Sequence, residues 1–503
     1  MSYRIDYDTS DLKQRICLIN GIDERMLDVS GFEVDYDLEI LKEFKNQLLS
    51  DKDKRFFIVG DYDCDGICAT VIIKRLFEDL KIESNYYIPS RSKQGYGINR
   101  DIVKTACDNG FKAIICVDNG AVAYDQLEYA RSLGLRTYVI DHHEYEKQID
   151  ADGFLHPDLF PDKYRDMCAA GLCCLLSNSF RKDDLTSVYG GLATLADMVS
   201  VLNYNRYLLK NMIAILESRQ VYPIMYLLGA NKISYDSLSY NVIPKINAVS
   251  RLEEMMNVNY VVKYLLDDST SCMKYLNKIE EINRTRKDLT LQMSELARRL
   301  ADDSGNFLVI KSEVFKEGLC GLIANRLLSL YNRPVLILAQ AEGMLKGSGR
   351  APEGFDMFGY LNEARQFFSA YGGHSQAVGL SMEQERYDDL INYIKTHPFD
   401  FTAADKDTLY FKQEDLSSEL LEELDELKPF GTGFREPLLC TDGNYQKKYN
   451  IKGIYPKFII NNKLEAISFN SALLNREFSM MIGHLKPDSY HKGNLSFVIE
   501  DLI

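Results

Sequence analysis

Three aspartates occur within five positions of one short stretch of the chain, at Asp61, Asp63 and Asp65 of "GDYDCDG". The stretch follows the apolar run "FFIV", so these carboxylates are expected at the end of a buried segment. Carboxylates that share a desolvated site repel one another, and their pKa values rise. Such a cluster persists when a cation neutralises it, so this stretch predicts a metal site.

A calcium-binding EF-hand loop begins with the same spacing, D-x-[DN]-x-[DN]-G. That loop has a glutamate at its twelfth position, where this chain has Ile72. It also follows a helix, whereas "RFFIVG" has the pattern of a strand. Both tests of context exclude an EF-hand, and we expect a metal site of another class.

Two further segments supply metal-binding side chains: Asp118 in "VDNG", and Asp141, His142 and His143 in "IDHH". Mixed carboxylate and imidazole ligands suit manganese, and magnesium less well, whereas a closed zinc site would need thiolates in paired spacing. Several bridging carboxylates suggest two ions about 3.5–4 Å apart, which activate water for phosphoryl displacement. Adjacent histidines on an extended segment point to opposite sides, so we expect one to bind metal and the other to face the substrate.

Two of the aspartates have a purely structural alternative. Asp118, taken alone, could cap a helix. Asp197 lies in the otherwise apolar stretch "LATLADMVS" and needs a partner, which could be a metal ion or equally a lysine or arginine.

The elements that position these side chains alternate between residues 55 and 141. The strand-like runs "RFFIVG", "ESNYYI", "KAIICV" and "RTYVI" are separated by helical segments, which predicts a parallel sheet with right-handed crossovers. In such sheets ligands bind beyond the carboxyl ends of the strands. Asp61, Asp118 and Asp141 each follow one of these runs, and three aspartates at one sheet edge are not explained by capping.

The rest of the chain predicts further domains. Residues 255–302 have helical periodicity without proline or glycine, which predicts a long helical connector. A second α/β pattern follows in "NFLVIK", "GLCGLIANRLLSLY" and "RPVLILAQ", and short alternating segments after residue 436 fit a small OB-type β-barrel. The expected α/β architecture therefore comprises a helical segment (1–50), a parallel-sheet domain (51–235), a helical connector (236–302), a second α/β domain (303–400), and a linker with a barrel (401–503).

Composition sets limits on function. At 503 residues about three domains are expected, and the net charge of −15 gives no overall attraction to nucleic acid. Basic stretches such as "INRTRK" and "NYQKKYNIKGIYPK" could bind it locally, although each alone is more often solvated surface. Eleven cysteines without CxxC spacing indicate a reducing compartment, and no apolar stretch suits a membrane span or signal peptide. A cytoplasmic protein is expected.

The metal-binding segments resemble a known family. "GDYDCDG", "VDNG", "IDHH" and "ADMV" are similar, in order and spacing, to the four motifs of the DHH phosphoesterase superfamily. Within it, "PSRSKQGYGIN", "CAAGL", "IPKINAVSRL", "LKGSGR", "YGGHSQAVGL" and "LKPFGTG" resemble the RecJ family of single-stranded-DNA exonucleases. The resemblance covers about residues 50–440, and the C-terminal segment is similar to the end of that family's OB domain.

The resemblance implies roles for particular residues. Two manganese ions, with magnesium as a possible substitute, would be held by the ligand set Asp61, Asp63, Asp65, Asp118, His142 and Asp197, with Asp118 as the expected bridge. His143, with Asp141, would be catalytic and stabilise the departing group. The second α/β domain would be the family's DHHA1 domain, and the expected phosphate-binding residues are Arg91, Asn247, Arg251, Ser348, Arg350, Gly372, Gly373 and His374.

The function implied by the resemblance is metal-dependent 5′-to-3′ hydrolysis of single-stranded DNA in repair and recombination. A monomer is expected, with a single-stranded-DNA-binding protein or a helicase as candidate partners. One alternative is a DHH phosphoesterase for short oligoribonucleotides or cyclic dinucleotides, but those relatives are typically shorter and lack the barrel. A manganese pyrophosphatase would need neither a basic surface nor a barrel. A catalytically silent scaffold would have lost metal ligands, and every ligand position is intact here.

Overall fold

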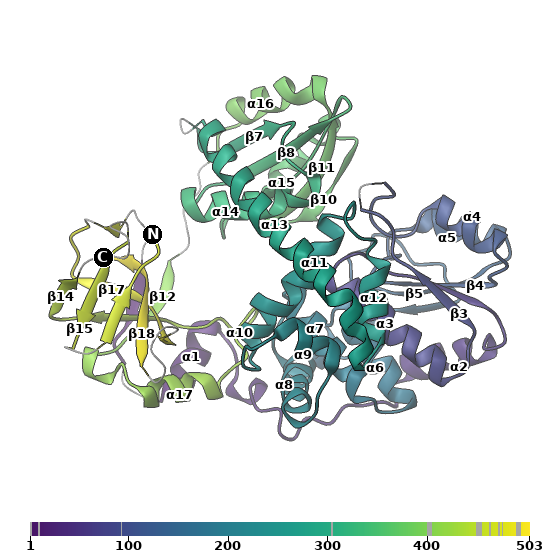
Figure 1. Ribbon diagram of the computed structural model, residues 1–503, viewed down its shortest axis with the longest axis horizontal. Coiled ribbons are helices and arrows are strands. Elements are labelled where there is room, and N and C mark those ends of the chain that lie inside the picture. The colour runs from purple at the N-terminus through teal and green to yellow at the C-terminus, as the bar shows by residue number, and fades with distance from the viewer. Residues whose placement is uncertain are drawn as a thin grey trace. The chain divides into compact units, whose positions relative to one another are not determined.

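The computed structural model describes residues 3–8, 11–91, 93–302, 305–399, 405–448, 455–461, 464–470, 473–474, 476–488 and 494–503. The chain divides into two compact units, each described by itself below (Figure 1). The larger unit comprises residues 33–199 and 207–402, and the smaller unit comprises residues 1–32, 200–206 and 403–503. No helix among the described residues is both long and apolar enough to cross a membrane.

The first sheet of the larger unit is entirely parallel, in the order β3-β2-β4-β5-β6. Its strands are β2 (Phe56–Val59), β3 (Ser84–Tyr87), β4 (Ala113–Val117), β5 (Arg136–Ile140) and β6 (Gly153–Leu155). Residues of β2 and β4 are buried throughout, because helices cover both faces, and this explains their continuous apolar runs. The four predicted strands are confirmed, and the short β6 is an addition.

Helices flank this sheet on both sides. They are α2 (Glu39–Ser50), α3 (Cys64–Asp79), α4 (Arg100–Asp108) and α5 (Tyr124–Ser132). Figure 1 shows α4 and α5 on one side of the sheet and α2 on the other. Ile102 and Val103 of α4 and Leu127 of α5 form one core with β2, β4 and β5.

A helical region follows the sheet. It contains α6 (Ala169–Phe180), α7 (Asp184–Ala196), α8 (Asn203–Ser218), α9 (Tyr222–Leu228), α10 (Tyr235–Ser237), α11 (Ile243–Arg251), α12 (Asn259–Leu266) and α13 (Met273–Leu300). The predicted connector is helical but not continuous, because it is interrupted between α12 and α13. There the hydroxyls of Ser269 and Ser271 donate to the carboxylate of Asp267, and such local bonds compete with the helix.

The second sheet of the larger unit has the order β10-β11-β9-β8-β7. Its strands are β7 (Leu308–Ser312), β8 (Val335–Ala341), β9 (Met344–Arg350), β10 (Ala370–His374) and β11 (Ala377–Glu383), and only β7 and β8 pair in parallel. Its helices are α14 (Cys320–Tyr331), α15 (Met357–Asn362) and α16 (Tyr387–Thr396). The predicted strand, helix and strand at its start are confirmed as β7, α14 and β8.

The smaller unit contains an eight-stranded mixed sheet in the order β1-β12-β13-β17-β18-β16-β15-β14. The strands are β1 (Tyr3–Asp6), β12 (Lys406–Tyr410), β13 (Leu438–Asp442), β14 (Tyr445–Lys448), β15 (Lys457–Ile460), β16 (Leu464–Ile467), β17 (Met480–Pro487) and β18 (Leu495–Leu502). Two helices, α1 (Leu12–Asn20) and α17 (Ser418–Glu426), belong to it. The alternating segments predicted after residue 436 are confirmed as β15 to β18, whereas residues 449–454 of "NYQKKYNIKGIYPK" lie outside the described residues.

The first 50 residues, predicted as a helical segment, contain a strand as well as helices. They begin with β1, which pairs in parallel with β12, so that Tyr3 lies opposite Lys406. Four residues are too few to reveal a strand by periodicity, and the partner strand lies about 400 residues away. The N-terminus therefore completes a sheet whose other strands all come from the C-terminal region.

Candidate metal centre

The aspartates after β2, β4 and β5 meet at the carboxyl edge of the parallel sheet, as predicted. Asp63 caps α3, because its Oδ1 accepts hydrogen bonds from the backbone N–H of Asp65 (2.9 Å) and Gly66 (3.1 Å). A Cβ at Gly66 would lie 2.6 Å from the backbone nitrogen of Asp61. Glycine is therefore what allows α3 to begin this close to the end of β2.

Seven side chains at this edge form three overlapping groups, in each of which the potential ligand atoms lie within 4.8 Å of one another. The groups are Asp61, Asp63 and Asp118; Asp118, His142 and His143; and Asp65, His142 and Asp197. Asp118 and His142 each belong to two groups. The structure therefore brings all six predicted metal ligands together in one cluster, which we call the metal centre.

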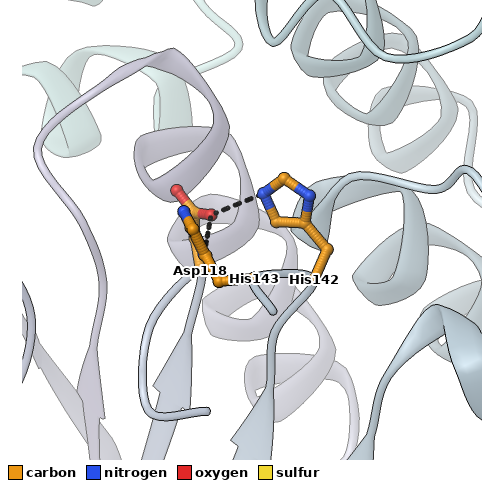
Figure 2. A group of neighbouring side chains, drawn as sticks. All are labelled: Asp118, His142 and His143. Carbon is orange, nitrogen blue, oxygen red and sulfur yellow. Dashed lines mark ion pairs between the residues drawn. The ribbon is translucent and has the colours of Figure 1, made fainter. Parts of the chain in front are cut away.

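His142 and His143 both face Asp118 (Figure 2). Nε2 of His142 lies 3.4 Å, and Nδ1 of His143 3.9 Å, from Oδ1 of Asp118. The prediction that adjacent histidines point to opposite sides is wrong. The alternation holds only for extended backbone, and here Oδ1 of Asp141 accepts the backbone N–H of both His142 (2.8 Å) and His143 (3.3 Å), so the chain bends after β5.

Asp141 orients His143 and stands apart from the three ligand groups. Its Oδ1 lies 2.8 Å from Nδ1 of His143, and its Oδ2 accepts the N–H of Ala121 at 2.8 Å. The carboxylate is 1% exposed. Burial disfavours a charged imidazole, but the hydrogen bond and charge of Asp141 overcome it and raise the pKa of His143 to about 9. His143 is therefore positioned to hold a proton at neutral pH.

The remaining carboxylates repel one another. Burial, and then the charges of Asp65 and Asp63, raise the pKa of Asp118 well above its usual range and the pKa of Asp197 to about 8. Asp61 and Asp118 each have a buried Oδ1 without a hydrogen-bond partner among the described residues. Unpaired buried carboxylate oxygens with neighbouring imidazole nitrogens are the donor set that a divalent cation satisfies.

Asp65 and Asp197 are placed by helix ends. Oδ2 and Oδ1 of Asp65 accept the N–H groups of Ala169 (2.9 Å) and Ala170 (2.8 Å) at the start of α6, where the helix dipole favours a negative charge. Asp197 follows the last residue of α7, with Oδ2 3.7 Å from Nε2 of His142. Among the described residues no lysine or arginine pairs with Asp197 within 4 Å, so the alternative of a structural ion pair with such a side chain finds no support.

The backbone at Asp118 is held in an unusual conformation. Its φ of +59° lies in the left-handed region, which non-glycine residues rarely adopt. The Tyr96 hydroxyl donates to the Asp118 carbonyl at 2.8 Å, and the Asp118 N–H donates to the Ile140 carbonyl at 2.9 Å. The Asn119 amide donates to the carbonyls of Val59 and Val117. Hydrogen bonds from Tyr96 and to the neighbouring strand thus fix the backbone that carries the Asp118 carboxylate.

The predicted arginines lie beside the metal centre in the larger unit. Arg251 Nη1 donates to the Gly318 carbonyl (2.9 Å), and Arg350 Nη1 donates to the Gly349 carbonyl (2.7 Å). Burial and the charges of Arg91, Arg286 and Arg350 lower the pKa of Arg251 to about 9, so it remains charged at pH 7. Burial and the charge of Asp63 raise the pKa of Asp61 well above its usual range, and the charge of Arg91 partly offsets this rise. We call Arg91, Arg251, Arg286 and Arg350 the arginine cluster.

Among the described residues, no carboxylate pairs with any member of the arginine cluster within 4 Å. Guanidinium groups bind phosphate through a planar pair of N–H donors. A surface of several arginines without counter-ions therefore suits a polyanion.

Asn247 lies on α11, and the other predicted substrate residues lie on β9 and β10 of the second sheet. Gly379 of the central strand β11 lies opposite Ser348 of β9 on one side and opposite Gly372 of β10 on the other. In the same way, Ala377 of β11 lies opposite Arg350 of β9 and His374 of β10. Each set of cross-strand partners extends over three neighbouring strands, a distance of about 10 Å. Gly373 has a φ of +140°, and a Cβ there would lie 2.2 Å from the Ala377 carbonyl oxygen, so the position requires glycine. His374 is exposed, whereas Ser348 is nearly buried.

Three family models match the chain in order: the DHH family N-terminal domain over residues 55–196, the DHHA1 domain over residues 304–396, and the RecJ OB domain over residues 409–501. The third of these is named for RecJ and covers most strands of the sheet in the smaller unit. The chain belongs to the RecJ family.

Named relatives agree with this assignment. The chain is 26% identical over 458 residues to the single-stranded-DNA-specific exonuclease RecJ of Bacillus subtilis, covering 85% of this chain and 58% of that protein. It is 27% identical over 440 residues to the Escherichia coli protein of the same name, covering 78% and 75%. This RecJ-family chain thus spans little more than half of the Bacillus relative.

A solved structure establishes the fold of this RecJ-family chain. The crystal structure of RecJ from Thermus thermophilus in complex with Mn²⁺ has a TM-score of 0.86 and 20% identity, covering all of this chain and 79% of that one. The predicted fold class is confirmed: a parallel-sheet DHH domain, a helical connector, a DHHA1 domain and an OB-type C-terminal domain.

Two residues near the metal centre were absent from the predicted site. The Tyr96 hydroxyl lies 3.1 Å from Nδ1 of His143, and Nε2 of His156 lies 3.2 Å from the His143 carbonyl oxygen. His156 directly follows β6, at the same sheet edge as the predicted aspartates. The rule that strand ends carry the site would have found His156, had the three-residue strand been recognised.

Proposed function

We propose that this chain is a metal-dependent exonuclease that hydrolyses the phosphodiester bonds of single-stranded DNA in the 5′-to-3′ direction, in repair and recombination. The observation that carries the proposal is the juxtaposition, within the larger unit, of the metal centre and an arginine cluster without counter-ions among the described residues. The names of the relatives support the substrate, and the family resemblance supports the direction of digestion.

The metal centre fits two divalent ions, manganese foremost and magnesium as a substitute, and solved RecJ structures from Thermus thermophilus contain each of these. When bound, such ions activate water and neutralise charge on the attacked phosphate. Asp61 and Asp63 would hold one ion and Asp65, His142 and Asp197 the other, with Asp118 shared. Two of the ligand groups support this division, and Asp118 joins the second set through the group that it shares with His142.

His143 is proposed as the residue that assists departure of the leaving oxygen. Its Nδ1 proton is held by Asp141, so its Nε2 proton is available for a phosphate or leaving-group oxygen. The pKa of about 9 keeps both nitrogens protonated at neutral pH. Asp141 acts through His143 and has no free oxygen for the substrate.

The arginine cluster is proposed to hold the phosphates of the strand. Contacts of this kind position a nucleic acid without reading its sequence. In the smaller unit, the rings of Tyr445 and Phe478 stack with centroids 4.6 Å apart, and Tyr445 is 42% exposed. Bases of single-stranded DNA stack on such exposed rings, so we propose that the OB-type domain also binds the strand.

The proposal extends to the setting of the enzyme. None of the eleven cysteines forms a disulfide bond, in agreement with a reducing cytoplasm. We propose that the enzyme acts as a monomer, with a single-stranded-DNA-binding protein or a helicase as its protein partner.

The deciding experiment is digestion of single-stranded DNA labelled at either the 5′ or the 3′ end, with Mn²⁺ or with chelator. Early release of the 5′-terminal nucleotide, only with metal, is the expected result. Early release of the 3′-terminal label would reverse the proposed direction. Turnover of dinucleotides without digestion of long strands would favour a phosphoesterase for short oligonucleotides, and binding without turnover would favour a scaffold.

A further inference from the structure

Arg286, on the long helix α13, is the member of the arginine cluster that neither the sequence motifs nor the comparisons assign. Its Nη2 donates to Oδ1 of Asn283, one turn earlier, at 2.9 Å. Asn283 is itself buried, so this contact fixes one edge of the guanidinium. A second donor of the same guanidinium, the Nε–H, is buried and has no hydrogen-bond partner among the described residues.

A buried donor without an acceptor is uncommon in proteins and indicates a missing partner. Burial lowers the pKa of Arg286, and no described carboxylate pairs with it within 4 Å. An ordinary structural arginine would have such a partner, as Arg75 has in Asp183 at 2.8 Å. Arg286 therefore presents a pre-oriented fork whose acceptor is not among the described residues.

The neighbours of Arg286 define the chemistry of that acceptor. Arg286 is one of the charges that lower the pKa of Arg251, so two guanidinium groups lie close together despite their repulsion. Asn247, on the adjacent helix α11, has a buried Oδ1 that also lacks a partner among the described residues. An amide turned by 180° presents its NH₂ instead. Two cations and an amide donor suit an anion with several oxygens, such as a phosphodiester.

The influences on the pKa values of Arg251 and Arg286 also relate these arginines to the metal centre. Burial and neighbouring arginines lower the pKa of Arg251, and the charge of Asp63 partly offsets this, so Arg251 is within electrostatic range of that predicted metal ligand. For Arg286, burial is the only resolved influence, and no aspartate of the metal centre contributes. Arg251 thus lies within electrostatic range of both Asp63 and Arg286.

We propose that Arg286, together with Asn247, binds a backbone phosphate of the DNA strand beyond the phosphates held at the metal centre and by Arg251. This inference rests on the proposed nuclease function and extends its strand-binding surface along α13. Arg286 contributes affinity for strands long enough to reach it, and the chemistry at the metal centre does not depend on it.

The test compares Arg286→Gln with Arg284→Gln, a matched control, since Arg284 is exposed on the same helix. Binding of oligo(dT) is measured in chelator, where no turnover occurs, at several salt concentrations. For Arg286→Gln we expect about 10-fold weaker binding, as for a lost charged hydrogen bond, and a log K versus log salt slope less steep by about 0.7. For Arg284→Gln we expect a Kd within about twofold of the wild type and an unchanged slope.

Two further readouts separate binding from folding. Arg286→Lys should keep the salt slope but lose affinity, because the charge remains and the fork is lost. The melting temperature of each variant, measured in chelator, should match that of the wild type, so that weaker binding is not a consequence of unfolding. Equal binding by the two glutamine variants would overturn the inference alone. Wild-type protein that binds oligo(dT) without ever digesting it would instead overturn the proposed nuclease function.

Discussion

Nε2 of His156 lies 3.2 Å from the carbonyl oxygen of His143, while its Nδ1 accepts the backbone N–H of Asp158 at 3.2 Å. One buried imidazole, 4% exposed, thereby ties the segment after β5 to the segment after β6. Both segments lie at the sheet edge that carries the metal centre. Nε2 contacts the segment after β5 and Nδ1 contacts the segment after β6, so substitutions that retain one contact can test the other.

His156→Asn keeps an acceptor near the Nδ1 position and loses the donor to His143, whereas His156→Gln keeps a donor near the Nε2 position. We expect His156→Asn to lower kcat about 10-fold, because small displacements of catalytic groups are costly, with KM for DNA within about twofold. We expect His156→Gln to retain most of kcat. Steady-state kinetics, with the free energy of unfolding measured alongside, distinguish the two. Equal losses in both variants, in step with stability, would mean that His156 only supports the fold.

Asp118→Asn removes the carboxylate shared by two ligand groups while keeping its shape. Activity should fall at least about 100-fold and Mn²⁺ affinity should drop, since even outer-shell partners of a metal contribute roughly 10- to 100-fold. In chelator, the melting temperature should rise rather than fall, because a buried charge repelled by its neighbours is gone. Calorimetric Mn²⁺ titration and thermal unfolding measure both effects, with Asp108→Asn as a surface control. A lower melting temperature in chelator would contradict this account of the repulsion.

Metal removal should make stability depend on pH. The pKa of Asp197 rises from 3.8 to about 8 in the folded protein, so its neutral form is favoured there. Its contribution to stability is then fully present below about pH 4 and is lost as pH rises through about 8. In chelator we therefore expect the melting temperature to fall between about pH 5 and pH 8, and Asp197→Asn should flatten the fall. Saturating Mn²⁺ should abolish the trend in the wild type, because the ions neutralise the carboxylates.

Two ion pairs in the smaller unit should differ in importance. Arg15 is 3% exposed, and it donates to the Asp6 side chain (3.2 Å) and to the Asp6 carbonyl (3.1 Å). Asp6→Ala leaves this guanidinium buried without a carboxylate, and we expect a loss of about 3 kcal/mol in the free energy of unfolding. Asp407→Ala breaks only the exposed pair with Arg4 and should cost less than about 1 kcal/mol. Denaturant unfolding followed by a probe in the smaller unit compares them, and equal costs would refute the distinction.

The chemistry of the site was largely predictable from the sequence, because it depends on short-range patterns. Asp61, Asp118 and Asp141 follow apolar runs long enough to identify as parallel strands, and the geometry of such sheets then brings them together. The orientation of His143 was not predictable in the same way. It depends on a bend imposed by the Asp141 side chain, which strand periodicity does not report.

Residues that act through distant packing were missed. His156 follows a strand of three residues, and β1 is recognisable only by its pairing with β12. Arg286 lies in "INRTRK", which also fits an ordinary exposed basic stretch. What distinguishes Arg286 from Arg284 is burial against α11, and burial of a charged side chain is a property of the tertiary structure.

The pairing of β1 with β12 also has a consequence for biosynthesis. Tyr3 and its partner Lys406 are separated by 406 − 3 = 403 positions in the chain. At roughly 5–20 residues per second, β1 emerges from the ribosome some 20–80 s before the strand it pairs with. All residues of the metal centre precede residue 198, so they are synthesised before β12, the strand with which β1 pairs. Among newly made chains, metal binding should therefore precede assembly of the OB-type domain.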